Sequence, residues 1–277
     1  MLTVEGVAYR YPGGDDVLQD IGFRAGAGEV LALVGRNGAG KSTLLRLLNG
    51  LRKPARGTVT VAGMNTAETP VHRLSQAIGT VFQAPEQQIF HATVQDEVMF
   101  GPRNRPLSPA ERTARVDEAL ERTGLSDFAR EHPLDLDQAR RRFVAVASVL
   151  ATAPAALLLD EPQRGLDAAG TARLETIIRQ EQTAGRLIVL VCHDMEFVAR
   201  LATRVVALSQ GRLAADCAPL AFFADPTLTA AASVEAPDLM RLATGLGLPP
   251  VLRPAAFAQN WLSRPASAPA QQVSPCD

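Results

Sequence analysis

The sequence predicts an α/β protein built around a mainly parallel sheet, and three continuous apolar runs carry that prediction. Residues 30–34, 157–159 and 187–191 contain no polar side chains, as expected for strands that are buried on both faces. Helical patterns at residues 41–49 and 172–181 follow the first two runs. Strands that alternate with helices along a chain are typical of parallel sheets, because each crossover between parallel strands needs a long connection.

The rest of the chain divides by its pattern into three further parts. Residues 2–63 alternate short β-type runs with turn signals, which predicts additional strands. Residues 83–153 are mostly helical and rich in charge, and one helix is expected to begin after Ser108, a capping residue followed by proline. Beyond about residue 238 the periodicity fades, and residues 263–277 are expected to form a disordered tail.

The composition of this 277-residue chain argues against several classes of protein. The 28 basic and 29 acidic residues nearly balance, which disfavours a broadly basic, nucleic-acid-binding chain. The three cysteines have no paired spacing, which disfavours a disulfide framework or a structural zinc site. Residues 1–10 do not resemble a signal peptide, and no window of about 18 apolar residues predicts a membrane span. We therefore expect a soluble, cytoplasmic protein that does not bind nucleic acid.

The clearest motif is the loop Gly-x-x-x-x-Gly-Lys-Ser at residues 35–42. Its glycines let backbone amides point at phosphates, and the following helix adds its positive N-terminal end. The lysine reaches terminal phosphates as a point charge, and the serine hydroxyl can ligate magnesium. A chance glycine-rich turn is the alternative, but the buried strand before the loop and the helix after it favour the phosphate site. The predicted nucleotide-binding residues here are Gly35, Asn37, Gly38, Gly40, Lys41, Ser42 and Thr43.

Polar residues also follow the other two apolar runs. Asp160 and Glu161 come after the first of them and His193 follows the second, so all three are expected at the carboxyl edge of the sheet, where such sheets bind ligands. Asp160 is predicted to hold magnesium, partly through water, and Glu161 to orient or deprotonate an attacking water. His193 is predicted to bind the γ-phosphate or that water. Each residue alone is more often structural, and only the phosphate loop favours the functional interpretation.

Together these residues resemble the nucleotide-binding subunits of ATP-binding cassette (ABC) transporters, in particular the cobalt-type ATPase of energy-coupling-factor importers. The resemblance runs from Leu2 to about Asp225. It implies a P-loop NTPase fold of the ABC type, with a mainly parallel core sheet, an N-terminal antiparallel β subdomain and an inserted helical subdomain at about 84–153. On this basis residues 1–237 form the ABC ATPase domain, and residues 238–277 form a C-terminal extension.

The resemblance also implies roles for individual residues. Tyr11 stands where the family places an aromatic side chain that stacks on adenine, and Gln83 matches a glutamine that touches magnesium or the attacking water. Asp167 matches the D-loop of the family, and His193 its switch histidine. Residues 93–104 are the part most specific to the cobalt type.

The implied activity is ATP hydrolysis, with ATP and Mg²⁺ bound, that powers uptake of a metal ion (cobalt or nickel) or a vitamin. The implied partners are a second ATPase subunit, a transmembrane energy-coupling subunit and a separate substrate-binding membrane subunit. The chain is then expected at the cytoplasmic face of the membrane, held there by its membrane partner.

The sequence departs from the family at its signature, Leu-Ser-Gly-Gly-Gln. The corresponding residues here are Leu136, Asp137, Gln138, Ala139 and Arg140. In the family, the serine hydroxyl and the glycine amides grip the γ-phosphate on the other subunit of a head-to-tail dimer. Asp137 brings a carboxylate to that place. Its repulsion with the γ-phosphate would cost about 4 kcal/mol per unit-charge pair at an intermediate effective dielectric, although the arginines that follow could offset part of this cost. Asp137 is also a good cap for the next helix.

In such a dimer each ATP site combines the phosphate loop of one subunit with the signature of the other. The altered signature is expected to weaken both sites of a homodimer but only one site of a heterodimer, so we favour pairing with a second, different ATPase. Two rival functions stay open. The chain could be a soluble, nucleotide-switched ABC protein that is not tied to a transporter, but residues 83–104 argue against that. It could also be a slow regulatory ATPase, which the signature favours and which Glu161 and His193 oppose.

Two minor features complete the sequence-based expectations. Gln163 stands where the family usually has a small hydroxyl residue, and no role is predicted for it. Phe90, Met99 and Phe100 either pack in the core of the helical part, the default for apolar residues on a helical pattern, or line a groove for the membrane subunit.

Overall fold

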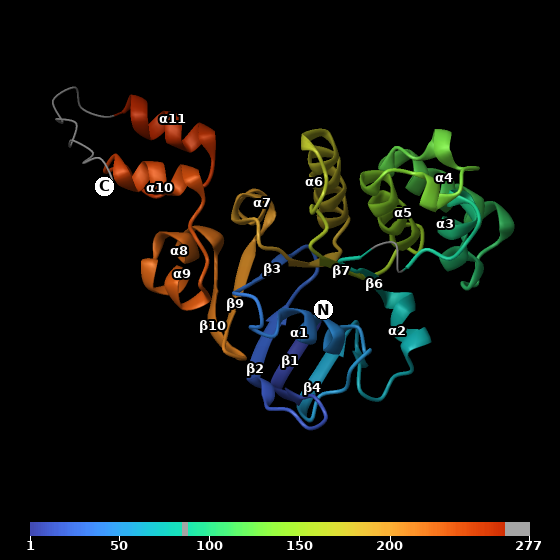
Figure 1. Cartoon of the computed structure of the whole chain (residues 1–277), viewed down its shortest axis with the longest axis horizontal. Coiled ribbons are helices and arrows are strands. Elements are labelled where there is room, and N and C mark those ends of the chain that lie inside the picture. Colours follow the sequence, from blue (N-terminus) through green and yellow to red (C-terminus); the bar gives the residue numbers. More distant parts are fainter. Residues whose placement is uncertain (85–87, 264–277) are drawn as a thin grey trace.

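A computed structural model describes residues 1–84 and 88–263 of the chain (Figure 1). The strands are β1 (Leu2–Arg10), β2 (Asp16–Ala25), β3 (Val30–Val34), β4 (Arg56–Val61), β5 (Met64–Asn65), β6 (Ile78–Val81), β7 (Ala156–Asp160), β8 (Leu187–Val191), β9 (Arg204–Ser209) and β10 (Arg212–Cys217). The predicted disordered tail falls, except for Ser263, on residues outside the described part of the chain.

The helices lie between and after these strands. They are α1 (Lys41–Leu48), α2 (Val71–Ala77), α3 (Val94–Arg103), α4 (Pro109–Thr123), α5 (Gln138–Leu150), α6 (Ala168–Thr183), α7 (Met195–Leu201), α8 (Pro219–Ala224), α9 (Pro226–Ala232), α10 (Asp238–Gly245) and α11 (Pro254–Leu262). Short 3₁₀ turns at Ser126–Phe128 and Pro133–Asp135 connect α4 to α5.

The strands form two sheets. Six strands pair in the order β10-β9-β3-β8-β7-β6, and every neighbour in this sheet is parallel except the hairpin of β9 and β10. The second sheet has the order β2-β1-β4-β5 and is antiparallel. The prediction of a mixed α/β fold with a mainly parallel core sheet and an N-terminal antiparallel part is confirmed.

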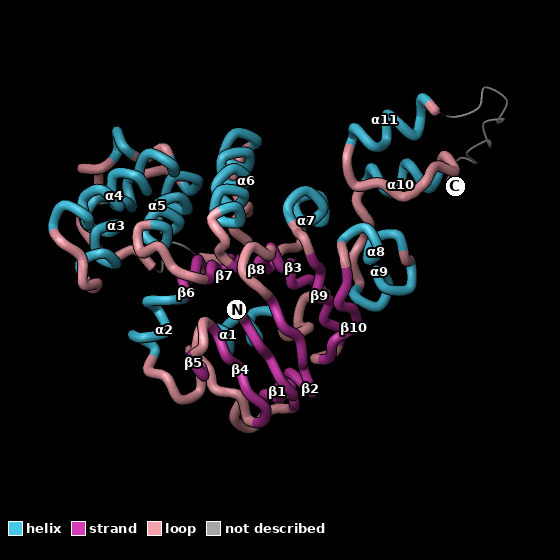
Figure 2. Tube along the Cα trace, turned by 180° about the vertical axis from the view of Figure 1, so that it is seen from behind, coloured by secondary structure: helices cyan, strands magenta, loops and turns pink. Residues whose placement is uncertain are grey.

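The parallel sheet is buried on both faces, which explains the continuous apolar runs. In β3, Val30, Ala32 and Val34 point into the core on the side of α5, α6 and α7, whereas Leu31 and Leu33 point into the core shared with α1 and the antiparallel sheet. Strand β8 alternates in the same way. Because successive side chains on a strand face opposite sides, both faces are covered only if every position is apolar. Figure 2 shows the parallel strands between these two layers.

The helices α3, α4 and α5 pack against one another beside β6, at one end of the molecule (Figure 1). Helix α4 begins as predicted. The hydroxyl of Ser108 accepts a hydrogen bond from the Glu111 amide (3.3 Å), and the Glu111 carboxylate accepts one from the Ser108 amide (2.7 Å). This reciprocal capping, with Pro109 at the first helical position, fixes where the helix starts.

A buried carboxylate ties these helices to the rest of the chain. Glu181 on α6 is only 2% exposed, and its carboxylate accepts a hydrogen bond from Arg122 of α4 at 2.6 Å and another from Arg186. Nearby, Arg173 of α6 donates to the carbonyl of Thr123, at the end of α4 (2.9 Å). Charged and backbone groups from α4 and α6 therefore satisfy one another at this contact.

The C-terminal part is more structured than its faded periodicity indicated. Helices α8 and α9 pack on β9 and β10. Helices α10 and α11 form a hairpin that projects away from the sheets (Figure 1), around a small core of Ala243, Leu248 and Val251. Within the described residues, none of the helices has both the length and the apolar character needed to cross a lipid bilayer.

We expect Glu181→Ala to lower the free energy of unfolding by about 3 kcal/mol, because removing one member of a buried ion cluster leaves the remaining charges uncompensated. Urea denaturation followed by circular dichroism measures the change. The matched control is Glu118→Ala, since Glu118 pairs with the same arginine but is 67% exposed, and such a pair contributes less than about 1 kcal/mol. Equal, small losses in both variants would contradict this assignment.

Candidate active site

The glycine-rich loop connects β3 to α1 at the carboxyl edge of the parallel sheet. Its first residue, Gly35, has a φ of 139°, and a Cβ atom there would lie 2.2 Å from the carbonyl oxygen of Leu208. Gly40, which precedes α1, has a φ of 103°, and its Cβ would lie 2.6 Å from a methyl group of Leu18. Both positions therefore require glycine, for conformation and for space.

Lys41 is held inside its own loop. Its ammonium group donates hydrogen bonds to the carbonyl oxygens of Gly35 (2.5 Å) and Arg36 (2.9 Å), and the residue is only 6% exposed. Burial lowers the pKa of Lys41, and the nearby carboxylates of Glu161 and Asp160 act in the opposite direction. An ammonium group held by neutral carbonyls gains when anionic oxygens replace them, because charge-assisted hydrogen bonds are the stronger ones.

The loop shares one cavity of about 250 Å³ with the acidic and histidine residues that the sequence singled out. The residues that line it are Val17, Asn37, Gly38, Gly40, Lys41, Ser42, Thr43, Gln83, Asp160, Glu161, Val191 and His193. They come from β2, from the loop and the start of α1, from the segment after β6 and from the ends of β7 and β8. The structure therefore brings most of the predicted site residues together.

Asp160 ends β7 and is 8% exposed. Burial raises the pKa of Asp160, and the adjacent Glu161 carboxylate raises it further, whereas Arg46 and Lys41 act in the opposite direction. A buried carboxylate beside a second one is stabilised by a cation, so this arrangement suits a positively charged ligand.

Glu161 has a strained backbone and a constrained side chain. Its φ is 50°, which is rare for a residue other than glycine. Its amide donates to the Val191 carbonyl (2.9 Å), and its own carbonyl accepts from Arg142 (3.1 Å). The carboxylate accepts a hydrogen bond from Gln163 through Oε2 (2.9 Å), and its Oε1 lies 3.5 Å from Nε2 of His193. Strain of this kind often accompanies functional sites.

The sequence predicted no part in this cluster for two of its residues. Arg142, on α5, is 2% exposed and also donates to the carbonyl of Gln83 (3.3 Å), so it links the ends of β6 and β7. The signal that could have identified Arg142 is an arginine at the start of an otherwise apolar helix segment. Gln163 is the other, and its unusual residue type was the visible signal.

Tyr11 and Gly35 do not line the cavity but are bonded to residues that do. The Tyr11 hydroxyl lies 3.2 Å from the hydroxyl of Thr43. The Tyr11 ring stands edge-on to Tyr9, with centroids 5.0 Å apart, and the guanidinium carbon of Arg52 lies 5.5 Å from its centroid. Tyr11 is thus at the rim of the phosphate loop, next to a cation.

The signature residues 136–140 and Asp167 lie outside the cavity lining. Asp137 is the N-cap of α5, as predicted: its Oδ1 accepts from the Arg140 amide (2.8 Å). Its Oδ2 pairs with the Arg140 guanidinium (2.5 Å), which also lies over the ring of Phe128, 4.4 Å from the centroid. Asp167 caps α6 through the Gly170 amide (2.7 Å). The charge of Asp137 is therefore balanced within its own chain.

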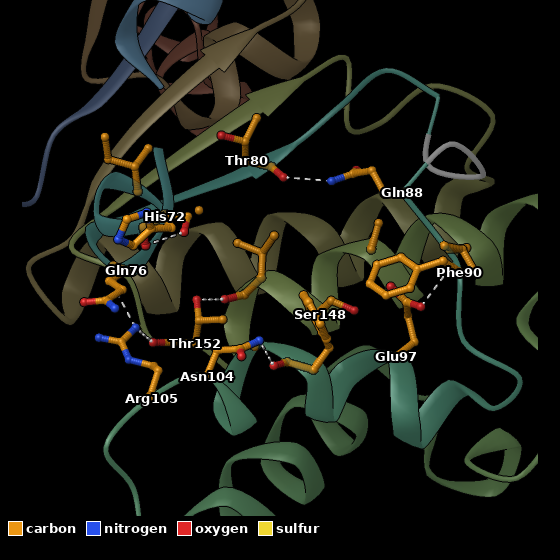
Figure 3. Close-up of a pocket in the computed structure, with 18 residues that line it drawn as sticks. His72, Gln76, Thr80, Gln88, Phe90, Glu97, Asn104, Arg105, Ser148 and Thr152 are labelled. Carbon is orange, nitrogen blue, oxygen red and sulfur yellow. Dashed lines mark hydrogen bonds between the residues drawn. The ribbon is translucent and has the colours of Figure 1, made fainter. Parts of the chain in front are cut away.

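A larger cavity of about 590 Å³ lies between α2, β6, α3 and α5 (Figure 3). Phe90 and Phe100 line it and are 65% and 46% exposed, with ring centroids 5.0 Å apart. Glu97 holds this edge in place, because its buried carboxylate accepts from the amides of Phe90 (3.0 Å) and His91 (2.9 Å). Met99 instead packs against the main core. The two phenylalanines thus fit the groove alternative, and Met99 fits the core alternative.

Comparison with known proteins identifies the family to which this fold and site belong. Residues 18–164 match the ABC transporter family. An ABC transporter ATP-binding protein of Pyrococcus furiosus is 41% identical over 251 residues, 91% of this chain and 95% of the relative. The cobalt import ATP-binding protein CbiO of Rhodobacter capsulatus is 40% identical and aligns with 88% of each chain.

Solved structures with a similar fold are also ATP-binding cassette proteins. CbiO1 of Clostridium perfringens, described as part of the ABC transporter complex CbiONQ, has a TM-score of 0.74 at 34% identity and covers 83% of this chain and 92% of its own. A dimeric ATP-binding cassette bound to ADP and Pi has a TM-score of 0.72 at 26% identity, over 79% of this chain and 99% of its own.

The chain therefore belongs to the ABC transporter family, whose ATP-binding subunits hydrolyse ATP to power transport. More particularly, it is the ATP-binding subunit of an importer of the energy-coupling type. The family, fold and enzymatic activity that the sequence predicted are confirmed.

We expect Lys41→Ala to weaken ATP binding about ten- to hundredfold, because a buried ammonium that bonds phosphate oxygens contributes as a charge-assisted donor. Titration with a fluorescent ATP analogue measures the dissociation constant. Lys53→Ala is the matched control, since Lys53 is exposed in the loop before β4, and its affinity should equal that of the unsubstituted chain. Unchanged affinity in Lys41→Ala would contradict the role of the loop.

Proposed function

We propose that the cavity at the carboxyl edge of the sheet binds the phosphates of ATP together with Mg²⁺, and that the residues around it carry out hydrolysis. The observation that carries this proposal is the convergence of Lys41, Asp160, Glu161, Gln83 and His193 around one cavity of about 250 Å³. One cation, two carboxylates and a histidine next to amides of a glycine-rich loop suit phosphoryl transfer. In this proposal Tyr11, which is hydrogen-bonded to Thr43 beside the cavity, stacks on the adenine.

The oxygen ligands of the cavity fit a magnesium ion. Ser42, Asp160 and Gln83 all line it. Their side chains carry a hydroxyl, a carboxylate and an amide oxygen, and magnesium prefers such hard oxygen donors, often with bound waters. The buried pair of Asp160 and Glu161 carries negative charge that a cation offsets. When bound, the ion neutralises phosphate charge, while Lys41 does the same from the loop side.

In this proposal Glu161 and His193 act on the attacking water. The Oε1 atom of Glu161 and Nε2 of His193 lie 3.5 Å apart beside the phosphate loop. A carboxylate there accepts the proton of a water molecule as that water attacks the γ-phosphate in line. His193 is more exposed than Glu161 and can reach the γ-phosphate or the same water.

The second subunit of the dimer supplies the remaining contacts, and we infer that it is a different ATPase. In this chain the position of the signature serine is Asp137, whose two carboxylate oxygens are occupied by the Arg140 amide and guanidinium. A carboxylate accepts hydrogen bonds only, so it does not replace a hydroxyl donor to a phosphate. Pairing with Arg140 lowers the repulsion but puts no hydroxyl at this position. A partner with an intact signature completes the site of this chain.

The membrane partner binds, in this proposal, at the 590 Å³ cavity beside α3. Exposed Phe90 and Phe100 offer an apolar edge there. Gln83 lines the nucleotide site, and Gln88, five residues later in the sequence, lines this cavity. This chain then lies at the cytoplasmic face of the membrane, bound to a transmembrane energy-coupling subunit. Cobalt, which the printed name of the Rhodobacter relative specifies, nickel and vitamins are the candidate substrates, recognised by a separate membrane subunit.

We expect the chain to co-purify with a multi-span membrane subunit and a second, different ATPase when it is tagged and extracted from host membranes with detergent. Mass spectrometry identifies the partners. Recovery of the membrane subunit with this ATPase alone would contradict the heterodimer and favour slow, functional sites in a homodimer. Recovery of soluble partners without any membrane subunit would contradict the importer assembly.

We expect Glu161→Gln to reduce ATP hydrolysis about a hundredfold or more, within the range that a positioned general base contributes, while ATP still binds. Because the bound ATP is not consumed, the dimer should stay closed, and size-exclusion chromatography with ATP detects it. Glu121→Gln is the control, since it removes the same charge from an exposed position of α4. Hydrolysis at the unsubstituted rate in Glu161→Gln would exclude Glu161 from this role.

A further inference from the structure

We propose that Gln163 is a positioning residue for hydrolysis, which fixes the Glu161 carboxylate so that one oxygen faces the attacking water. This inference rests on the proposed role of Glu161. The contact that carries it is the hydrogen bond from Nε2 of Gln163 to Oε2 of Glu161, at 2.9 Å. Both residues lie in the turn that follows β7, and Glu161 is 7% exposed.

The direction of this hydrogen bond follows from the chemistry of the two groups. An ionised carboxylate only accepts, so the amide of Gln163 must turn its N–H toward Glu161. As a result, Oε1 of Gln163 is buried and finds no hydrogen-bond partner among the described residues. A buried acceptor without a partner costs free energy, so the bond to Glu161 is made at the expense of the other end of the amide.

The same bond gives the two oxygens of Glu161 different environments. Oε2 is occupied by Gln163, whereas Oε1 is buried, makes no hydrogen bond to any described residue, and lies 3.5 Å from Nε2 of His193. The backbone of Glu161 is already fixed by its bonds to Val191 and Arg142. With the backbone and Oε2 held, Oε1 is the carboxylate oxygen that no described donor occupies, and it lies on the side of His193. We therefore assign to Oε1 the proton taken from water.

The length of the side chain makes this contact specific to glutamine. The hydroxyl of serine or threonine is attached directly to Cβ, whereas the amide nitrogen of glutamine lies two atoms further along the side chain. A small hydroxyl residue, which the ABC resemblance leads one to expect here, is therefore too short to make the same bond from the same backbone. The residue with no predicted role in the sequence thus supports the Glu161 carboxylate directly.

Gln163→Met tests the inference, because methionine has nearly the same length but no donor. In the co-purified complex we expect kcat for ATP hydrolysis to fall about ten- to hundredfold, the effect of losing a hydrogen bond to a charged group. We expect KM, and the affinity for a non-hydrolysable ATP analogue, to stay within about twofold, since Gln163 does not line the phosphate cavity. The matched control is Gln182→Met, whose amide donates to the Gly28 carbonyl (3.2 Å) far along α6 and should leave kcat unchanged.

A double-mutant cycle shows whether Gln163 acts through Glu161. In single-turnover hydrolysis, adding Gln163→Met to Glu161→Gln should cause no further loss, because the group that Gln163 positions is already gone. Three outcomes would each overturn the proposal. The rate losses of the two single variants could multiply in the double variant, Gln163→Met could keep the unsubstituted kcat, or Gln163→Met could raise KM at constant kcat. If Gln163→Met unfolds at a lower temperature than the control, Gln163→Leu, which is also neutral and has no donor, replaces it, and there we expect the same loss of kcat at unchanged analogue affinity.

Failure of this inference and failure of the proposed function give different results. If Glu161→Gln hydrolyses ATP at the unsubstituted rate, the role of Glu161 is wrong and the inference falls with it. If Glu161→Gln is inactive while Gln163→Met keeps the unsubstituted kcat, only the positioning role is wrong.

Discussion

The parallel pairing of β3, β7 and β8 is the constraint on which the rest of this molecule depends. Because the three strands run in the same direction, the glycine-rich loop, the Asp160–Glu161 pair and His193 all follow strands that end at one edge of the sheet. Burial of both faces fixes the register, since a shift by one residue would exchange the side chains of the two cores. Apolar packing thereby holds two carboxylates that repel each other, together with the Lys41 ammonium group, around one small cavity.

The elements and most of the site could be predicted from the sequence because their determinants are local. The Ser108 cap, the glycine-rich loop and the strand ends are all encoded within a few residues. What the sequence did not reveal depends on contacts between distant or differently oriented groups. Arg142 meets Glu161 and Gln83 only after α5 packs beside β6 and β7, and the bond from Gln163 to Glu161 requires the strained turn after β7. The C-terminal helices lacked a strong periodic pattern because their shared core is small.

Charge in this chain is balanced by two different routes. At the signature segment, Asp137 and Arg140 are three residues apart on one exposed helix end and neutralise each other, so the local sequence alone produces the pairing. At Glu181, the two arginines come from outside α6, and the pairing exists only in the folded chain. The first route changes what the segment presents to another subunit without affecting the fold. The second joins α4 to α6 through a buried carboxylate.

The placement of Lys41 has a consequence for covalent chemistry. Lysine occurs only twice in the sequence, at Lys41 and Lys53, and nearly all other positive charge is carried by arginine, which reagents and enzymes directed at primary amines do not modify. One of the two lysine amines is enclosed by the glycine-rich loop, and the other is exposed. Among the side chains, an acetyl group or an amine-directed tag can therefore attach only to these two lysines. The difference in reactivity between the Lys41 and Lys53 amines reports whether the loop is occupied.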